Sequence, residues 1–333
     1  MRGCWAGLAL AAGLVSGWAE EPVSRIGFGS CYKPEKKTGL WKAVSDLDPQ
    51  VWLWLGDNVY ADVIDGKYIK KDLPKDAFTR AYADLKKSEG VTTLQGLPKD
   101  RVMATWDDHD YGRNDAGKHW ERKEEARRAF AAFWGGEGRS DGVYSSRDFG
   151  PEGKRIRVVL LDTRFNRDDP GESGDILGDM QWTWLGEQLR KPGAALVVLG
   201  SSIQVLANQH RFEKWGNFPK AKERLFQLIR ESGARVVMVS GDRHHAEISR
   251  QTENPVGYPL FDVTSSGLTE KSSIQNEAND LRVGEVYVGR NFGVIRVDWS
   301  RSDPEICLEI RGEDGRLERE VSFPLSQLAP PKG

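Results

Sequence analysis

The sequence predicts an α/β protein with a sheet core, outer helices and a β-rich C-terminal part. Apolar runs typical of buried strands alternate with segments of helical periodicity over most of the chain. From Ile248 onward the helical periodicity is weak and β-like runs predominate. Several predicted strands are followed directly by polar residues, and ligand sites of open α/β sheets lie beyond the carboxyl ends of the strands.

The individual elements follow from these patterns. Strands of the alternating part are predicted at Val23–Phe28, Val51–Leu55, Arg101–Trp106, Arg155–Leu161, Ala195–Leu199 and Arg235–Val239. Helices are predicted at Gly39–Leu47, Pro74–Lys87, Lys118–Trp134, Leu177–Leu189 and Pro219–Arg230. The β-like runs of the last third are Leu260–Val263, Val283–Val288, Gly293–Val297 and Ile306–Ile310.

The composition excludes several classes of protein. Of the 333 residues, 38% are apolar and 29% charged, which is ordinary for a globular chain and argues against disorder. Lys and Arg number 48 against 50 Asp and Glu, a formal net charge of −2. Because a nucleic-acid-binding protein normally carries a clear positive excess, we expect no stable complex with nucleic acid.

The N-terminal segment differs from the rest. Arg2 precedes an apolar run from Cys4 to Val15, and small residues at Gly17 and Ala19 frame a cleavage site. This pattern predicts a Sec-type signal peptide over residues 1–19 and a periplasmic or extracellular protein. The alternative is an uncleaved anchor helix, but the run is shorter than the roughly 20 residues a membrane span needs. No later segment is predicted to cross a membrane.

Two cysteines, Cys31 and Cys307, remain after removal of this segment. In an exported protein two cysteines are compatible with one long-range disulfide. Cys31 also follows a predicted strand, where it could instead bind a metal ion. Both interpretations are open at this point.

The first candidate motif is WLGDNVYAD at residues 54–62, directly after a buried strand. Asp57 follows a glycine at the strand end, so its carboxylate is presented with little steric hindrance. Tyr60 lies three residues further and can reach the same place. Taken alone, Asp57 could equally be a turn residue that caps the next helix.

The second motif is TWDDHDYGRND at residues 105–115, which gathers acidic residues, His109 and Arg113 within a short span. Adjacent carboxylates repel one another unless cations neutralise them. Hard divalent ions prefer carboxylate oxygens, and histidine also suits iron or zinc. The motif therefore predicts metal binding, with a solvated acidic loop as the alternative.

The third motif is SGDRHHAE at residues 240–247, with Asp242 and His244 one residue apart and on the same side of an extended chain. Gln204, after another strand, could offer a neutral carbonyl ligand. Arg164 and Arg243, together with the arginine of the second motif, could hold an anion through paired hydrogen bonds. Ordinary ion pairs are the alternative for each arginine.

The ordered set of motifs resembles the PhoD-type alkaline phosphatases of the calcineurin-like metallophosphoesterase superfamily. The motifs are FGSC at 28–31, the two described at 54–62 and 105–115, LLDTR at 160–164, SSIQ at 201–204, SGDRHHAE at 240–247 and TSSGLT at 264–269. The resemblance implies a four-layer αββα sandwich over residues 20–333, with a metal cluster at the strand ends. One departure is Asp110, where many members carry glutamate.

The resemblance also implies roles for individual residues. The metal ligands carried over are Cys31 as a thiolate, Asp57 as a bridge, Tyr60, Asp108, Gln204, Asp242 and His244. His109 takes the position of the acid beside the leaving group. Fe(III) and Ca(II) are the implied metals, since sulfur, phenolate and imidazole suit the former and oxygen ligands the latter, with other divalent metals as alternatives.

The implied function is a secreted phosphoesterase that hydrolyses small-molecule phosphate esters with a metal-activated hydroxide. Arg113, Arg164 and Arg243 would steady the phosphoryl oxygens. Alternatives are a nuclease or phospholipid diesterase on the same chemistry, and a metal-stabilised binding protein without activity. The segments Val63–Leu97 and Asp168–Asp175 are expected to shape the cleft, and the motifs do not decide between monoesters and diesters.

Overall fold

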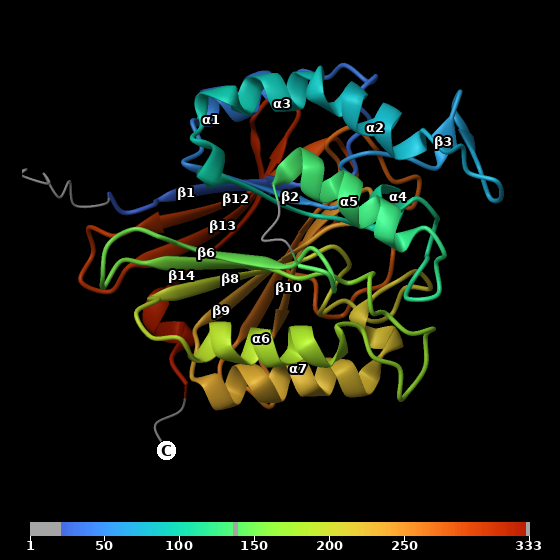
Figure 1. Ribbon diagram of the computed structural model, residues 1–333. Helices are drawn as coiled ribbons and strands as arrows, with labels where there is room; N and C mark the ends of the chain where they lie inside the picture. Colours follow the sequence, from blue (N-terminus) through green and yellow to red (C-terminus); the bar gives the residue numbers. More distant parts are fainter. Residues whose placement is uncertain (1–20, 136–138, 331–333) are drawn as a thin grey trace, which may run out of the picture.

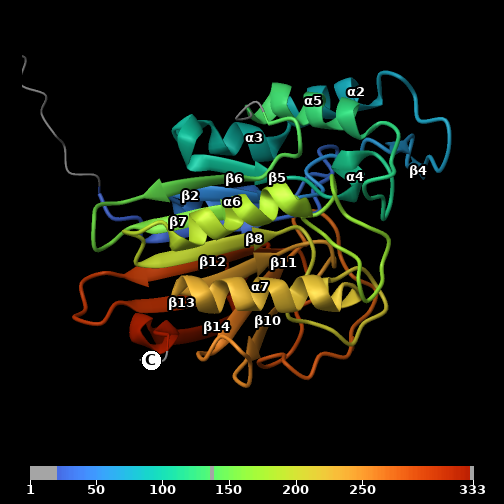
Figure 2. The same cartoon turned by 60° about the horizontal axis from the view of Figure 1, so that its bottom comes forward.

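The computed structural model describes residues 21–135 and 139–330, so the predicted signal peptide lies outside the described residues. Two six-stranded sheets form the middle of the molecule, and helices cover both outer faces (Figure 1). Helices α1 (Leu40–Leu47), α2 (Ala77–Lys86), α3 (Glu89–Thr93) and α5 (Lys123–Trp134) lie on one side. Helices α6 (Gly178–Arg190) and α7 (Pro219–Ser232) lie on the other, and come forward in Figure 2. The predicted four-layer α/β architecture is confirmed.

The first sheet combines the N-terminal strands with the end of the chain. Its order is β14 (Leu317–Pro324), β13 (Glu305–Gly312), β12 (Asn291–Asp298), β1 (Arg25–Gly29), β2 (Val51–Leu55) and β5 (Val102–Thr105). Strands β1, β2 and β5 are parallel, whereas β12, β13 and β14 join them as an antiparallel meander. The carboxyl ends of the three parallel strands therefore share one edge of the sheet.

The second sheet is built mainly from the middle of the chain. Its order is β10 (Ala246–Gln251), β11 (Leu260–Ser265), β9 (Val236–Ser240), β8 (Leu196–Ser201), β7 (Ile156–Leu160) and β6 (Ser145–Phe149). Strands β7, β8, β9 and β11 are parallel, and antiparallel strands close both edges. The loops after the parallel strands of both sheets reach the side of the molecule where α4 (Asp108–Tyr111) lies, at the right of Figure 1.

Strand β2 shows how the sequence divides the core into two parts. Val51, Leu53 and Leu55 belong to the cluster between the two sheets. Trp52 and Trp54 point to the opposite face, into the cluster under the first helical layer. Side chains alternate across a strand, so the run VWLWL buries aliphatic groups between the sheets and indoles beneath the helices.

Most predicted elements are present, with shifted ends. The helices predicted from Pro74 and from Lys118 begin later, at Ala77 and Lys123. The strand predicted at Val283–Val288 is wrong: in the described structure this segment makes one isolated bridge, Tyr287 with Ala246, and the preceding Arg282 makes another with Ser249. Strand β6, of sequence SSRDF, has no apolar alternation and was not predicted.

No helix among the described residues has the length and apolar character needed to cross a bilayer.

Candidate metal and catalytic site

Loops after parallel strands of both sheets bring the predicted ligands together. Cys31 follows β1, Asp57 follows β2, Asp108 follows β5, and Asp242 and His244 follow β9. Residues separated by up to 213 positions, from Cys31 to His244, thereby meet at one end of the sheets. This is the edge at which α/β sheets commonly bind ligands.

One group of donors surrounds Asp57 on the side of Cys31. The Cys31 Sγ lies 3.5 Å from Asp57 Oδ2. The Tyr60 hydroxyl lies 3.4 Å from the same oxygen and 3.5 Å from His244 Nε2. Ligand atoms of Cys31, Asp57 and His244 all lie within 4.8 Å of one another, a spacing at which they could hold one metal ion.

A second group of donors also contains Asp57. Ligand atoms of Asp57, Asp108 and His109 lie within 4.8 Å of one another. The His109 backbone amide donates a hydrogen bond to Asp57 Oδ1 at 3.3 Å. Because Asp57 belongs to both groups, its carboxylate is placed where it could bridge two cations, as the resemblance implies.

The backbone at the predicted ligands adopts a conformation that most side chains avoid. Cys31, Asp57, Asp242 and His244 have φ values of 61°, 49°, 71° and 57°. Eight non-glycine residues with positive φ occur in the described structure, and half of them are these four. Such conformations cost about 1–3 kcal/mol each and are concentrated at functional sites. The surrounding fold therefore holds these side chains in place at an energetic cost.

Helix α4 directs Asp108 and His109 toward Asp57. The Asp110 carboxylate accepts hydrogen bonds from the amides of Asp107 at 3.0 Å and Asn58 at 3.1 Å. It therefore caps the start of α4 and ties it to the loop after β2. Asp110, at which the sequence departs from the family pattern, is thus a structural residue buried beneath the site.

The electrostatics of the cluster call for cations. Burial raises the pKa of Asp57 well above its usual range, with neighbouring Asp108 adding to the effect. Burial, with the nearby Asp57, likewise raises the pKa of the Cys31 thiol. The Asp108 Oδ1 is buried and accepts no hydrogen bond. Ionised thiolate and carboxylates at these positions need positive charge beside them, so a cluster of metal ions fits this donor set.

His109 is held in place by Asp62, a residue to which the sequence analysis assigned no role. Its Nδ1 lies 2.9 and 3.0 Å from the two oxygens of Asp62, and its ring stacks on Tyr60 with centroids 4.3 Å apart. Burial lowers the pKa of His109, but Asp108 and Asp57 outweigh it and raise the pKa well above its usual range. Asp62 is part of the WLGDNVYAD motif, so its proximity in sequence was the available signal.

A cleft of about 760 Å³ opens over the cluster. Its lining includes Asp57, Asp108, His109, Asp242 and His244. The two segments expected to shape the cleft each contribute to it, through Tyr68 and Pro170 respectively. The predicted cleft-forming role of these segments is confirmed.

The three predicted arginines have different surroundings. Arg243 lines the cleft, with its Nη2 2.6 and 2.8 Å from the Glu277 carboxylate and its guanidinium 3.9 Å from the Phe212 ring centre. Arg164 is fully buried and pairs with Asp107, its Nε 2.6 Å from Oδ1, and with Glu213. Both arginines therefore form ion pairs, and of the three predicted arginines Arg243 is the one that also lines the cleft.

Arg113 lies over the Trp120 ring at 5.3 Å, is exposed, and is not among the residues that line the cleft. Gln204 is also apart from the cluster. Its amide nitrogen donates to Glu247 at 2.7 Å and to Thr264 at 2.8 Å, beneath the second sheet's strand ends. The contacts of Arg113 do not support its predicted role, whereas the Gln204 carbonyl oxygen is buried and has no hydrogen-bond partner among the described residues. Both roles stay predictions.

The two described cysteines are free thiols. Cys31 is buried beside Asp57, whereas Cys307 lies on β13 with its Sγ 3.7 Å from Glu309. The disulfide alternative is therefore wrong, because the two side chains belong to different surroundings.

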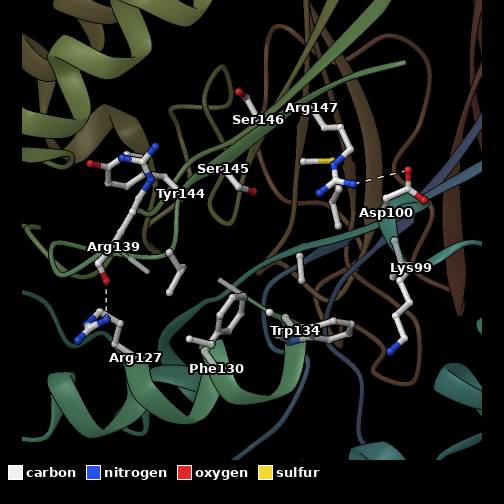
Figure 3. Close-up of a pocket in the computed structure, with 17 residues that line it drawn as sticks. Lys99, Asp100, Arg127, Phe130, Trp134, Arg139, Tyr144, Ser145, Ser146 and Arg147 are labelled. Carbon is white, nitrogen blue, oxygen red and sulfur yellow. Dashed lines mark hydrogen bonds and ion pairs between the residues drawn. The ribbon is translucent and has the colours of Figure 1, made fainter. Parts of the chain in front are cut away.

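A second cavity, of about 390 Å³, lies between β5, α5 and β6 and is drawn in Figure 3. Phe130 and Trp134 form part of its wall, with arginines around the opening. Arg147 pairs with Asp100 at 3.7 Å, and Arg127 donates to the Arg139 carbonyl at 2.5 Å. None of the predicted site residues lines this cavity.

Two packed sheets flanked by helices, with a cluster of ligands at the strand ends, define a fold of the metallophosphoesterase type. The sequence profile of the PhoD-like phosphatases matches residues 26–283. The chain therefore belongs to the PhoD-like phosphatase family and is a phosphoric ester hydrolase.

Solved structures agree on the fold. The structure of PhoD matches with a TM-score of 0.72 and 16% identity, covering 93% of this chain and 71% of that one. Purple acid phosphatase PPD1 from yellow lupin matches with a TM-score of 0.65 and 12% identity, covering 92% and 54%. GAP50, the anchor in the inner membrane complex of Plasmodium, matches at 0.59 and 13%, covering 91% and 89%. At these identities the likeness concerns the fold alone. No curated protein sequence matches the chain.

Proposed function

We propose that the protein is an exported, metal-dependent phosphoesterase that uses Fe(III) and Ca(II). The observation that carries this proposal is the position of Asp57, whose carboxylate lies within 4.8 Å of ligand atoms of Cys31 and His244 on one side and of Asp108 on the other. A single carboxylate common to two groups is what a two-metal phosphoesterase centre requires, because both ions must lie beside the same phosphoryl group.

The two groups differ in chemistry, and this difference supports the choice of metals. Cys31, Tyr60 and His244 offer sulfur, phenolate and imidazole, which suit iron. Burial lowers the pKa of His244 to about 4, so its ring is neutral and able to bind a metal at physiological pH. On the other side of Asp57, Asp108 offers only oxygen, as does Asp242 on the cleft wall, and oxygen ligands suit Ca(II).

The metal ions would lower the pKa of a water molecule and neutralise charge on the phosphoryl oxygens. The protein's own groups complete the reaction. His109, positively charged and hydrogen-bonded to Asp62 through Nδ1, has Nε2 left to protonate the oxygen of the leaving group. Arg243 is anchored by Glu277, and its Nη1 lies 3.9 Å from Asp242 on the cleft wall, a position from which the guanidinium could steady a phosphoryl oxygen.

Export rests on the N-terminal residues 1–19, whose charged start, apolar run and small residues are typical of a Sec-type signal peptide. We propose a periplasmic or extracellular location on this basis. Mass spectrometry of the protein from the expressing cells would identify the mature N-terminus. A mature chain that still begins at Met1 and is found in the cytoplasm would contradict export.

The test of the enzyme is release of nitrophenol from 4-nitrophenyl phosphate and bis(4-nitrophenyl) phosphate over pH 6 to 10. The protein would be loaded with iron and calcium, and metal content measured by plasma mass spectrometry. We expect the wild-type protein to lose activity on chelation and to regain it when iron and calcium are added back. Asp57→Asn should be inactive. Met180→Ala, an exposed residue of α6 distant in sequence from every site motif, is the matched control.

The outcomes separate the remaining alternatives. The ratio of monoester to diester hydrolysis defines the substrate class, and faster cleavage of nucleic acid or phospholipid than of either small ester would favour the corresponding diesterase. Full activity in the metal-free protein would contradict the metal-dependent mechanism. If zinc or manganese restored the activity and iron did not, that metal would take the place of Fe(III) in the proposal.

A further inference from the structure

A short hairpin joins the catalytic acid to the mouth of the cleft. Strands β3 (Val63–Ile64) and β4 (Lys67–Tyr68) pair antiparallel, with Val63 opposite Tyr68. The turn residues Asp65 and Gly66 have φ values of 49° and 74°, as a tight two-residue hairpin turn with positive φ at both positions requires. The hairpin extends beside α4 at the right of Figure 1.

The hairpin is tied to His109 at its base. The Ala61 amide donates to the His109 carbonyl at 3.1 Å, and the Ile69 amide donates to the Asp62 carbonyl at 2.7 Å. Asp62, which holds His109 Nδ1, therefore stands at the start of the hairpin, and Tyr68 stands at its end. One hairpin consequently positions both the partner of the acid and an aromatic ring.

The Tyr68 ring lies against His109. The two ring centroids are 5.3 Å apart and the planes are inclined by 34°. Tyr60 packs at 4.3 Å from the same imidazole, so two tyrosines contact His109. Tyr60 is buried, whereas Tyr68 is 49% exposed and lines the cleft.

This exposure is unusual within the described chain. The large apolar or aromatic side chains that are exposed are Tyr68, Met180 and Leu317. Of these, only Tyr68 lies in the cleft. The Tyr68 ring is exposed beside His109, the group proposed to protonate the leaving oxygen. It is therefore available to contact the substituent that this oxygen carries.

We propose that Tyr68 is the contact surface for the leaving group, and that the cleft favours phosphate esters whose leaving group carries an aromatic ring. The inference rests on the proposed function and adds a substrate class to it. In the reaction, water oxygen forms the new bond to phosphorus, the ester P–O bond breaks, and the departing oxygen takes a proton from His109. Since the departing oxygen meets His109, its substituent meets Tyr68, and aromatic rings prefer stacked or edge-to-face contact.

The test compares two esters that differ only in aromaticity: benzyl phosphate and cyclohexylmethyl phosphate. Both release a primary alcohol of similar size and basicity, so the chemical step makes similar demands on His109. They are supplied as monoesters or as methyl diesters, whichever class the wild-type protein hydrolyses faster, and kcat/KM is measured from the released alcohol.

We expect the wild type to prefer the benzyl ester. In Tyr68→Leu the benzyl-to-cyclohexylmethyl ratio of kcat/KM should fall about three- to tenfold, the range that an aromatic pair contributes beyond its buried area. Tyr68→Phe should retain the ratio, because it keeps the ring. Met180→Ala is the control for loss of an exposed apolar side chain elsewhere.

The outcomes are distinguishable from failure of the proposed function. A wild-type protein that is folded and metal-loaded yet hydrolyses neither ester nor the nitrophenyl esters contradicts the proposed function itself. An active wild type whose ratio is unchanged in Tyr68→Leu overturns the assignment of Tyr68 alone. Equal losses on both esters would show that Tyr68 only supports His109, which also overturns it.

Discussion

The strand ends of the two sheets contribute differently to the same cleft. The first sheet presents Cys31, Asp57 and Asp108, whose ligand atoms converge and include a buried oxygen without a hydrogen-bond partner. The second sheet presents Arg164, which pairs with Asp107 and Glu213, and Gln204, whose amide nitrogen donates to Glu247 while its carbonyl oxygen is buried without a partner in the described structure. The edge of the first sheet is arranged to bind cations. Much of the edge of the second sheet instead forms contacts that stabilise the first.

The connection between the two edges is a buried ion pair. Arg164 from the second sheet binds Asp107, which directly precedes Asp108 in the first. It also binds Glu213, which Arg167 contacts at 3.0 Å. A buried guanidinium at this point offsets part of the acidic charge of the cluster. From the second sheet, His244 joins the ligand group of Cys31 and Asp57, and Asp242 lines the same cleft.

The strongest test of this comparison is removal of the shared ligand. Asp57→Asn should lower kcat/KM by about 10³-fold or more, since loss of metal charge stabilisation costs several kcal/mol. Metal content should fall in the same variant, while circular dichroism reports a retained fold. Unchanged turnover would mean that the first-sheet edge is not the reactive centre.

The catalytic acid should show the next largest effect, and one that depends on the substrate. His109→Ala should reduce hydrolysis of an alkyl ester by about 10²–10⁴-fold, with a smaller loss for a nitrophenyl ester that needs no protonation. Asp62→Asn should follow the same pattern more weakly. Asp65→Asn in the same hairpin is the matched control, because Asp65 is exposed and asparagine tolerates its positive φ. Equal losses on both esters would exclude a proton-donor role.

The supporting role of the second edge predicts an effect on stability. Arg164→Leu leaves the buried Asp107 without its partner and should lower the free energy of unfolding by about 3–5 kcal/mol. Urea unfolding of the metal-loaded protein measures this. Arg301→Leu removes an exposed arginine that also pairs with two acids, and should cost no more than about 1 kcal/mol. Similar losses of unfolding free energy in the two variants would contradict the supporting role assigned to the edge of the second sheet.

Gln204 sharpens the comparison, because its amide nitrogen is hydrogen-bonded within the protein while its carbonyl oxygen, the group that the resemblance assigns to a metal, has no partner in the part of the chain that the structure describes. Gln204→Leu removes the hydrogen bonds to Glu247 and Thr264 and should cost about 1–3 kcal/mol of stability. Bound iron and calcium should stay at wild-type stoichiometry. Loss of one ion per chain would instead establish Gln204 as a ligand and extend the metal centre into the second edge.

The smallest effect is expected at the exposed arginine of the second motif. Arg113→Ala should change kcat/KM by no more than about twofold, because its side chain lies over Trp120 and not in the cleft. Arg243→Ala, on the cleft wall, is the comparison and should lose more. A larger loss in Arg113→Ala than in Arg243→Ala would reverse the assignment of the two residues.

Residues next to strand ends were the ones that sequence analysis could find. Cys31, Asp57, Asp108 and Asp242 each follow an apolar run closely, and parallel strands bring such positions together whatever the loops do. The pairing of Asp62 with His109 was not accessible in this way, because it depends on the path of a hairpin. Likewise, nothing in the sequence around Arg164 distinguishes a phosphate-binding arginine from one that neutralises Asp107.

The sequence by itself determined most of the strands and helices of the two sheets' α/β part, the alternation of aliphatic and indole side chains on β2, and the residues carried to the sheet edge. These are local properties, set by side-chain periodicity and by the residues that end each strand. The tertiary structure alone decided which polar residues remain open to a ligand and which are neutralised by a partner. That choice depends on distances between side chains far apart in the chain, and on the burial that makes an unpaired charge costly.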